Sequence, residues 1–76
     1  MSEMEWLRTF ANNLVYFMEM HGYSQSELAR SAGLEQASIS RYIGARQMPG
    51  PKALINLAHV FGISLDEFMD FGSMIR

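Results

Sequence analysis

Residues Gln25 to Gly44 read QSELARSAGLEQASISRYIG, and this stretch decides the fold. Within it a small residue (Ala29), a glycine (Gly33) and a β-branched apolar residue (Ile39) follow one another at separations of four and six positions. Such spacing is typical of two short helices that meet at a tight bend. The alanine allows a close approach, the glycine takes a backbone angle that a side chain resists, and the isoleucine packs into the core. The arrangement turns the second helix outward, where it can enter a DNA major groove.

Start and stop signals along the rest of the chain divide it into five helices. A serine followed three residues later by a glutamate forms a capping box, which marks a helix start, at Ser24–Glu27 and again at Ser64–Glu67. Pro51 suits the first turn of a helix, and residues 45–50 before it form a loop. A glycine follows each of four segments with helical apolar spacing, at the position expected for a helix C′ residue: Gly22, Gly33, Gly44 and Gly62. The expected helices cover about residues 2–21, 25–32, 36–43 and 51–61, with a short fifth helix after Ser64.

Apolar residues at helical spacing supply one core for these helices, and no run alternates as a strand would. The first helix carries five of them on one face: Leu7, Phe10, Leu14, Phe17 and Met18. The third and fourth helices add seven more: Ile39, Tyr42, Ile43, Leu54, Leu57, Ala58 and Phe61. A chain of 76 residues makes a single domain, residues 1–76. We therefore expect an all-α fold, a compact five-helix bundle whose second and third helices form a helix-turn-helix.

The composition argues against an enzyme and against a membrane protein. There is no cysteine, which excludes a disulfide, a thiolate metal site and a cysteine nucleophile, and which suits a reducing cytoplasm. No apolar run approaches the ~20 residues of a membrane span, and the start MSEMEW is acidic, unlike a signal peptide. His21 and His59 lack ligand spacing, and we find neither paired carboxylates nor a glycine loop that would hold phosphate. We expect no catalytic residue, no metal, no cofactor, no membrane contact and a cytoplasmic location.

The charges are unevenly distributed along the chain. The net charge of −2 is unfavourable for a nucleic-acid-binding protein. Residues 24–52, however, carry a net charge of +2, from four basic and two acidic side chains: Arg30, Arg41, Arg46, Lys52, Glu27 and Glu35. The segments before and after them are each acidic. The positive charge therefore lies in the part of the chain that would face DNA.

Motifs at matching distances run through nearly the whole chain. They are SQxELA at 24–29, GL at 33–34, SISR at 38–41, Pro49, LxxLA at 54–58 and GISLDEF at 62–68. Together they resemble the Cro/CI-type helix-turn-helix family of phage and bacterial repressors, over a core of about residues 10–68 that leaves an apolar C-terminal tail at 69–76. The resemblance implies five helices of which the third is the recognition helix. It also implies dimers that bind two-fold symmetric operators.

Two positions depart from the pattern of that family. Many members carry an arginine late in the first helix and a glutamate late in the third, as a buried ion pair, where this chain has Met18 and Ile43. Replacement of a buried pair by packed apolar groups is often neutral or stabilising, so we expect these two side chains to touch in the core. Glu35 replaces the serine or threonine that often caps the third helix. Its carboxylate suits the helix dipole, and against DNA it either accepts a hydrogen bond from cytosine or repels phosphate.

The outward face of the third helix carries the candidate DNA contacts. Glutamine can pair with adenine and arginine with guanine through two hydrogen bonds each, and an alanine methyl can touch thymine. The expected base contacts are Glu35, Gln36, Ala37, Ser40 and Arg41. The expected phosphate contacts are Gln25, Arg46 and Lys52. The alternatives are a solvated polar helix face, a phosphate contact for Arg41, and simple capping of the second helix around Gln25.

The C-terminal end of the chain has more apolar side chains than one small domain buries easily. Surplus apolar surface at a terminus often marks an interface, so we expect a homodimer. The expected contact residues are Phe68, Met69, Phe71, Met74 and Ile75. The alternative is a tail folded over the core of its own subunit.

Two functions from different classes remain open. The first is a sequence-specific, double-stranded-DNA-binding transcriptional regulator, a repressor that occludes a promoter as a dimer. The second is a protein-interaction module or antitoxin-like partner on the same scaffold, with weak or no DNA binding and a further protein as its partner. Glu35 and the net negative charge support the second hypothesis.

Overall fold

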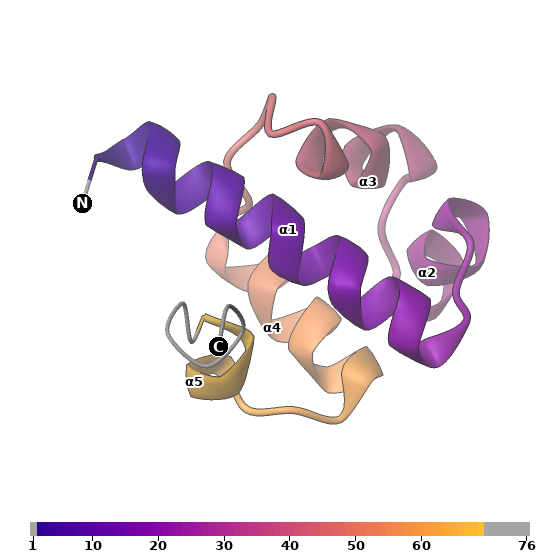
Figure 1. Ribbon diagram of the computed structural model, residues 1–76. Coiled ribbons are helices and arrows are strands. Elements are labelled where there is room, and N and C mark those ends of the chain that lie inside the picture. Colours follow the sequence, from indigo (N-terminus) through magenta and orange to yellow (C-terminus); the bar gives the residue numbers. More distant parts are fainter. Residues whose placement is uncertain (1, 70–76) are drawn as a thin grey trace.

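Five helices make up the computed structural model, which describes residues 2–69 (Figure 1). They are α1 (Glu3–His21), α2 (Gln25–Ala32), α3 (Gln36–Ile43), α4 (Pro51–Phe61) and α5 (Leu65–Phe68). The long helix α1 crosses the front of the molecule in Figure 1, with α3 above it, α2 beside its C-terminal end, and α4 and α5 below and behind. The described residues contain no strand. The expected all-α fold of five helices is confirmed.

Capping boxes start three of the five helices. At α2, the Glu27 amide donates to Ser24 Oγ at 3.2 Å, and the Ser24 amide donates to Glu27 Oε1 at 3.0 Å. The same reciprocal pair forms between Ser64 and Glu67 at α5, as the sequence predicts. A third box, between Ser2 and Glu5, starts α1. The same serine-to-glutamate spacing in the sequence marks this third box, but it is not among our sequence-based predictions.

The C-terminal ends of helices α1 to α4 share one hydrogen-bond pattern. After α1, α2 and α4, a glycine with φ between 67° and 72° reverses the chain, and the next amide bonds back to a carbonyl five residues earlier. The end of α3 differs from our prediction: Gly44 has φ −81°, and Ala45 takes the left-handed conformation with φ 54°. The Arg46 amide closes this turn on the Arg41 carbonyl at 2.9 Å. The C′ position of α3 is therefore Ala45 and not Gly44.

The core gathers the predicted apolar faces around an aromatic cluster. Four rings from α1, α4 and α5 lie with centroids 5.5–6.0 Å apart: Phe10, Phe17, Phe61 and Phe68. Met18 is buried, while Ile43 and Leu54 are half-buried and pack against the core. Neither Met18 nor Ile43 lies in solvent, and their direct contact stays a prediction.

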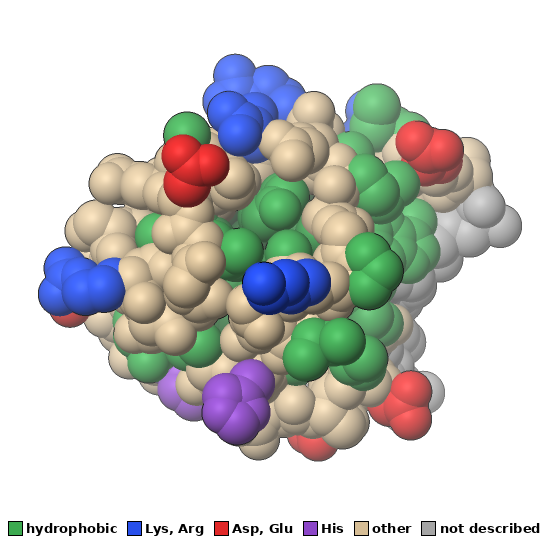
Figure 2. Space-filling model, turned by 180° about the vertical axis from the view of Figure 1, so that it is seen from behind, with side chains coloured by type: hydrophobic (Ala, Val, Ile, Leu, Met, Phe, Trp, Pro, Cys, Tyr) green, Lys and Arg blue, Asp and Glu red, His purple; other side chains and the backbone are tan. Residues whose placement is uncertain are grey.

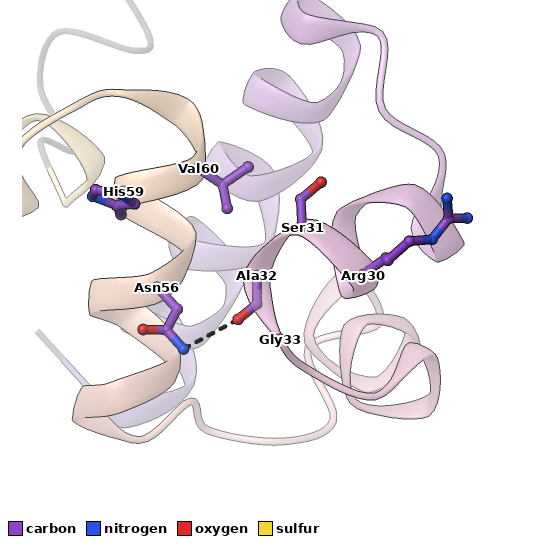
Figure 3. Close-up of a pocket in the computed structure, with 7 residues that line it drawn as sticks. All are labelled: Arg30, Ser31, Ala32, Gly33, Asn56, His59 and Val60. Carbon is purple, nitrogen blue, oxygen red and sulfur yellow. Dashed lines mark hydrogen bonds between the residues drawn. The ribbon is translucent and has the colours of Figure 1, made fainter.

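Two asparagine side chains join helices that are distant in sequence. Buried Asn13 of α1 donates to the Phe68 carbonyl of α5 at 2.9 Å. Asn56 of α4 donates to the Ala32 carbonyl at the end of α2 at 3.1 Å (Figure 3). Both bonds satisfy carbonyls at helix ends, which have no partner within their own helix. They fix α5 against α1, and α4 against the first helix of the helix-turn-helix.

In the part of the chain that the structure describes, none of the helices is both long enough and apolar enough to span a membrane.

Candidate nucleic-acid interface

One face of α3 is anchored in the core, and this leaves the opposite face in solvent. Ile39 is fully buried, and the ring of buried Tyr42 meets Phe10 of α1 edge-on at 5.9 Å. The side chains on the other face are free of the core: Gln36, Ala37 and Arg41 are exposed, and Ser40 is half-buried. Four of the predicted base-contact residues therefore share the outward side of one rigid helix.

Glu35 is the N-cap residue of α3 and is exposed. Its carbonyl accepts the amides of Ser38 and Ile39 at 3.0 and 3.2 Å, but its carboxylate makes no capping bond. The carboxylate stands next to the positive end of the helix dipole, where a negative charge is favourable. Its side chain is accordingly available to a partner at the entrance of α3.

Arg41 is held by a residue that our sequence analysis does not single out. Its Nε donates to Oε1 of Gln47, a half-buried side chain in the loop after α3. Because the two residues are six positions apart on opposite sides of a helix end, no helical spacing pairs them. The only sequence signal is a polar side chain in the loop next to the expected site.

Arg46 lies across the end of α3, close to Gly44. A Cβ added at Gly44 would come within 3.1 Å of Arg46 Nε and 3.5 Å of the Ser40 carbonyl oxygen. The absence of a side chain at Gly44 thus lets the arginine pack against the last turn of the helix. The structure places Arg41 and Arg46 at the same end of α3.

The other two predicted phosphate contacts lie at helix starts. Gln25 is the first residue of α2 and is half-buried, and Lys52 is exposed in the first turn of α4. The Ser24 side chain caps the Glu27 amide, so the amides of Gln25 and Ser26 have no partner within α2. Free amides at a helix start favour an anion such as phosphate.

The basic side chains are not spread evenly over the surface. Figure 2, which views the molecule from behind, shows a group of Lys and Arg side chains at the top, the end that α3 occupies in Figure 1, and further basic side chains at the left edge and near the middle of the face. One acidic side chain lies beside the basic group at the top, and the others lie singly nearer the edges of the same view. Part of the local positive charge expected from the sequence therefore lies at the end of the molecule that carries α3.

The predicted dimer contacts need one correction. Phe68 is 0% exposed, because its ring fills the space between Phe10, Phe17 and Phe61 in its own subunit. It has no surface to offer a second copy. Met69 is half-buried against the core, and the other expected contacts lie outside the described residues: Phe71, Met74 and Ile75.

A hollow of about 340 Å³ lies between α2 and α4 (Figure 3). Its lining includes Arg30 and Ser31 of α2 and Asn56 and His59 of α4. The Arg30 side chain points away from α4 in Figure 3, and the Asn56 amide is engaged by the Ala32 carbonyl. The polar side chains do not converge there, so we place no ligand in this hollow.

Comparisons with known proteins agree with this geometry. The family model described as Helix-turn-helix matches residues 14–68. Among solved structures, the chain is similar to the crystal structure of a hypothetical transcription factor, NHTF, from Neisseria. The TM-score is 0.80 and the identity 23%, and the match covers 90% of this chain and 79% of that chain. At this identity the likeness shows a shared fold. No curated protein matches the chain.

The matched residues run from the middle of α1 to the end of α5, so they include the whole helix-turn-helix, the core beneath it and the exposed face of α3. The chain belongs to the Cro/CI-type helix-turn-helix family of DNA-binding transcriptional regulators.

Proposed function

We propose that this protein is a sequence-specific repressor that binds a two-fold symmetric operator in double-stranded DNA as a homodimer, and that it acts by covering a promoter. One observation carries the proposal: α3 is fixed to the core by Ile39 and Tyr42, and it presents a polar face with one arginine to solvent. A rigid helix with such a face is what major-groove recognition requires.

Each side chain on this face has a role in the proposal. Gln36, in the first turn of α3, pairs with adenine, and Arg41 pairs with guanine. Ala37 contacts a thymine methyl, and Ser40 accepts or donates one hydrogen bond. Glu35, at the entrance of the helix, accepts from a cytosine amino group.

Contacts to the DNA backbone hold the helix in register. Gln25 and the free amides beside it bind one phosphate, and Arg46 and Lys52 bind others. Such contacts carry no sequence information, but they supply much of the affinity and make it dependent on salt.

The proposed dimer has to span one repeat of the DNA helix. The subunit measures 31 Å in its longest dimension. In this proposal the two copies place their α3 helices about 34 Å apart, which is the separation of successive major grooves on one face of DNA and is comparable to the length of one subunit. Met69, Phe71, Met74 and Ile75 form the contact between the copies in this proposal.

Selection from random duplexes at low salt tests the DNA-binding part, and it should enrich one palindromic site. The double variant Gln36→Ala/Arg41→Ala should then lose specific binding while keeping its helical circular dichroism. Arg8→Ala removes an exposed arginine from α1 and serves as a charge-matched control. A selection without an enriched site, or equal binding by the double variant and the control, contradicts the proposal.

Light scattering at micromolar concentration tests the dimer. The full-length triple variant Phe71→Ser/Met74→Ser/Ile75→Ser should have half the mass of the wild type. Phe68 is kept in this variant, because its loss would damage the core. Equal masses for both proteins would remove the tail from the proposed contact.

A protein-interaction module is the second candidate, and the free carboxylate of Glu35 at the start of α3 favours it. In this case Glu35 repels phosphate, and Glu35→Gln should strengthen binding to any duplex. In the repressor proposal, Glu35→Gln should change binding mainly at one cytosine-containing base pair.

A further inference from the structure

The loop after α3 folds back on the helix that it leaves. Ala45 reverses the chain in the left-handed conformation, and the Arg46 amide bonds to the Arg41 carbonyl at 2.9 Å. This turn brings Gln47 beside the last turn of α3, where its Oε1 accepts the Nε–H of Arg41. Gln47 is half-buried, whereas Arg41 is exposed.

We propose that Gln47 is a positioning residue for specificity: it fixes the Arg41 guanidinium so that its two Nη groups meet a guanine end-on. This inference rests on the proposed function. It concerns a residue outside the recognition helix that does not itself touch DNA.

The chemistry of the guanidinium leads to this assignment. Its five N–H donors form a planar fork, and two of them can meet O6 and N7 of guanine. They do so either side-on, through Nε and one Nη, or end-on, through both Nη groups. Since Gln47 occupies Nε, only the end-on arrangement remains without breaking a bond of the free protein.

The same bond favours guanine over phosphate as the partner of Arg41. A phosphate contact works with many side-chain orientations, whereas paired bonds to a base edge need one orientation. Fixing a long side chain before binding also lowers the entropy that is lost on binding. Arg46, which packs over Gly44 at the same end of the helix, is free to serve a phosphate instead.

Two variants separate the hydrogen bond from the rest of Gln47. Gln47→Met keeps the length of the side chain but has no oxygen, and Gln47→Glu keeps the acceptor. The measurement is the Kd for the selected operator and for operators in which each guanine is replaced by adenine. Gln47→Met should lower discrimination at one guanine about three- to tenfold, a part of what a full bidentate pair provides. Gln47→Glu should retain the discrimination and weaken binding to every duplex, because it adds a negative charge.

A double-mutant cycle ties the effect to Arg41. In an Arg41→Ala background, Gln47→Met should change discrimination no further. The inference is overturned if Gln47→Met leaves discrimination unchanged in the wild-type background, or lowers it equally in both. It is also overturned if Arg41→Ala reduces the salt dependence of binding without loss at any guanine, because Arg41 then contacts phosphate.

A measurement without DNA distinguishes this inference from the proposed function. In the free protein, the Nε proton of Arg41 should exchange with water more slowly than that of exposed Arg8, and Gln47→Met should remove the difference. Equal exchange at both arginines in the wild type refutes the Gln47 bond even if an operator is found. Slow exchange at Arg41 with no enriched DNA site instead refutes the repressor proposal and leaves the bond standing.

Discussion

Ala45 holds a backbone conformation that glycine takes at the equivalent place in α1, α2 and α4. In the folded protein, the left-handed conformation strains a residue that has a Cβ by about 1–2 kcal/mol. A glycine in place of alanine lowers the stability by about 0.4–1 kcal/mol, because it gives the unfolded chain more conformational entropy. We therefore expect Ala45→Gly to raise the free energy of unfolding by about 0.5–1 kcal/mol, measured by urea denaturation. Ala37→Gly is the matched control, and within a helix it should lower the same free energy by a similar amount. A loss of stability in both variants would mean that Ala45 is not strained.

Glu27 links the start of α2 to pH. Its bonds to the Ser24 amide and hydroxyl lower the pKa of the exposed carboxyl below its ordinary value of 4.5, and Arg30 lowers it further. The folded pKa lies below the unfolded one, so this contribution to stability is present above pH 4.5 and is lost as the pH falls through the folded pKa. Glutamine also completes a capping box. Glu27→Gln should therefore flatten the dependence of the urea midpoint on pH below 4.5. Parallel pH curves for the wild type and Glu27→Gln would contradict the assignment.

The short helix α5 is part of the core although it has only four residues. Phe68 completes the aromatic cluster, and its carbonyl accepts the bond from buried Asn13. Phe68→Ala should lower the free energy of unfolding by about 3–5 kcal/mol, a large share of the 5–15 kcal/mol of a typical domain. Leu65→Ala, one turn earlier and 43% exposed, should change it by less than about 0.5 kcal/mol. Similar unfolding midpoints for the two variants would show that α5 is not anchored by its phenylalanine.

The helices were predictable because their signals are local. Serine-to-glutamate boxes and terminal glycines act within a few residues, and the apolar spacing places Phe10 and Ile39 on inner faces. The end of α3 could not be predicted in this way, because Ala45 takes the left-handed conformation and Gly44 only precedes it. The hydrogen bonds of Asn13 and Asn56 could not be predicted either. They join residues 55 and 24 positions apart, and no local sequence pattern specifies such a pair.

The sequence predicts one part of the candidate site and not the rest. The exposed face of α3 follows from the burial of Ile39 and Tyr42, so the sequence predicts which side chains face outward. The support that Gln47 gives to Arg41 depends on how the loop folds back, and the sequence does not show it. The prediction that Phe68 contacts a second subunit is wrong. The sequence shows an excess of apolar residues near the C-terminus, but it does not show that the core has room for this ring.

The whole molecule is acidic, with a net charge of −2, yet its proposed DNA face is basic. Counterion release depends on the basic groups that meet phosphate and not on the net charge of the protein. If Arg46 and Lys52 of each subunit contact phosphate, a dimer neutralises about four phosphates, and log K against log salt concentration should have a slope near −3.6.

Removing one of these basic side chains tests whether the local positive charge, and not the net charge, governs DNA binding. Lys52→Gln removes two contacts per dimer and should make that slope less steep by about 1.8, with equal loss of affinity for operator and random DNA. Arg8→Gln on α1 makes the same change in net charge and should leave the slope unchanged, because Arg8 lies outside the proposed interface. Equal changes of slope in the two variants would mean that the net charge governs binding, and the basic end of the molecule would lose its assigned role.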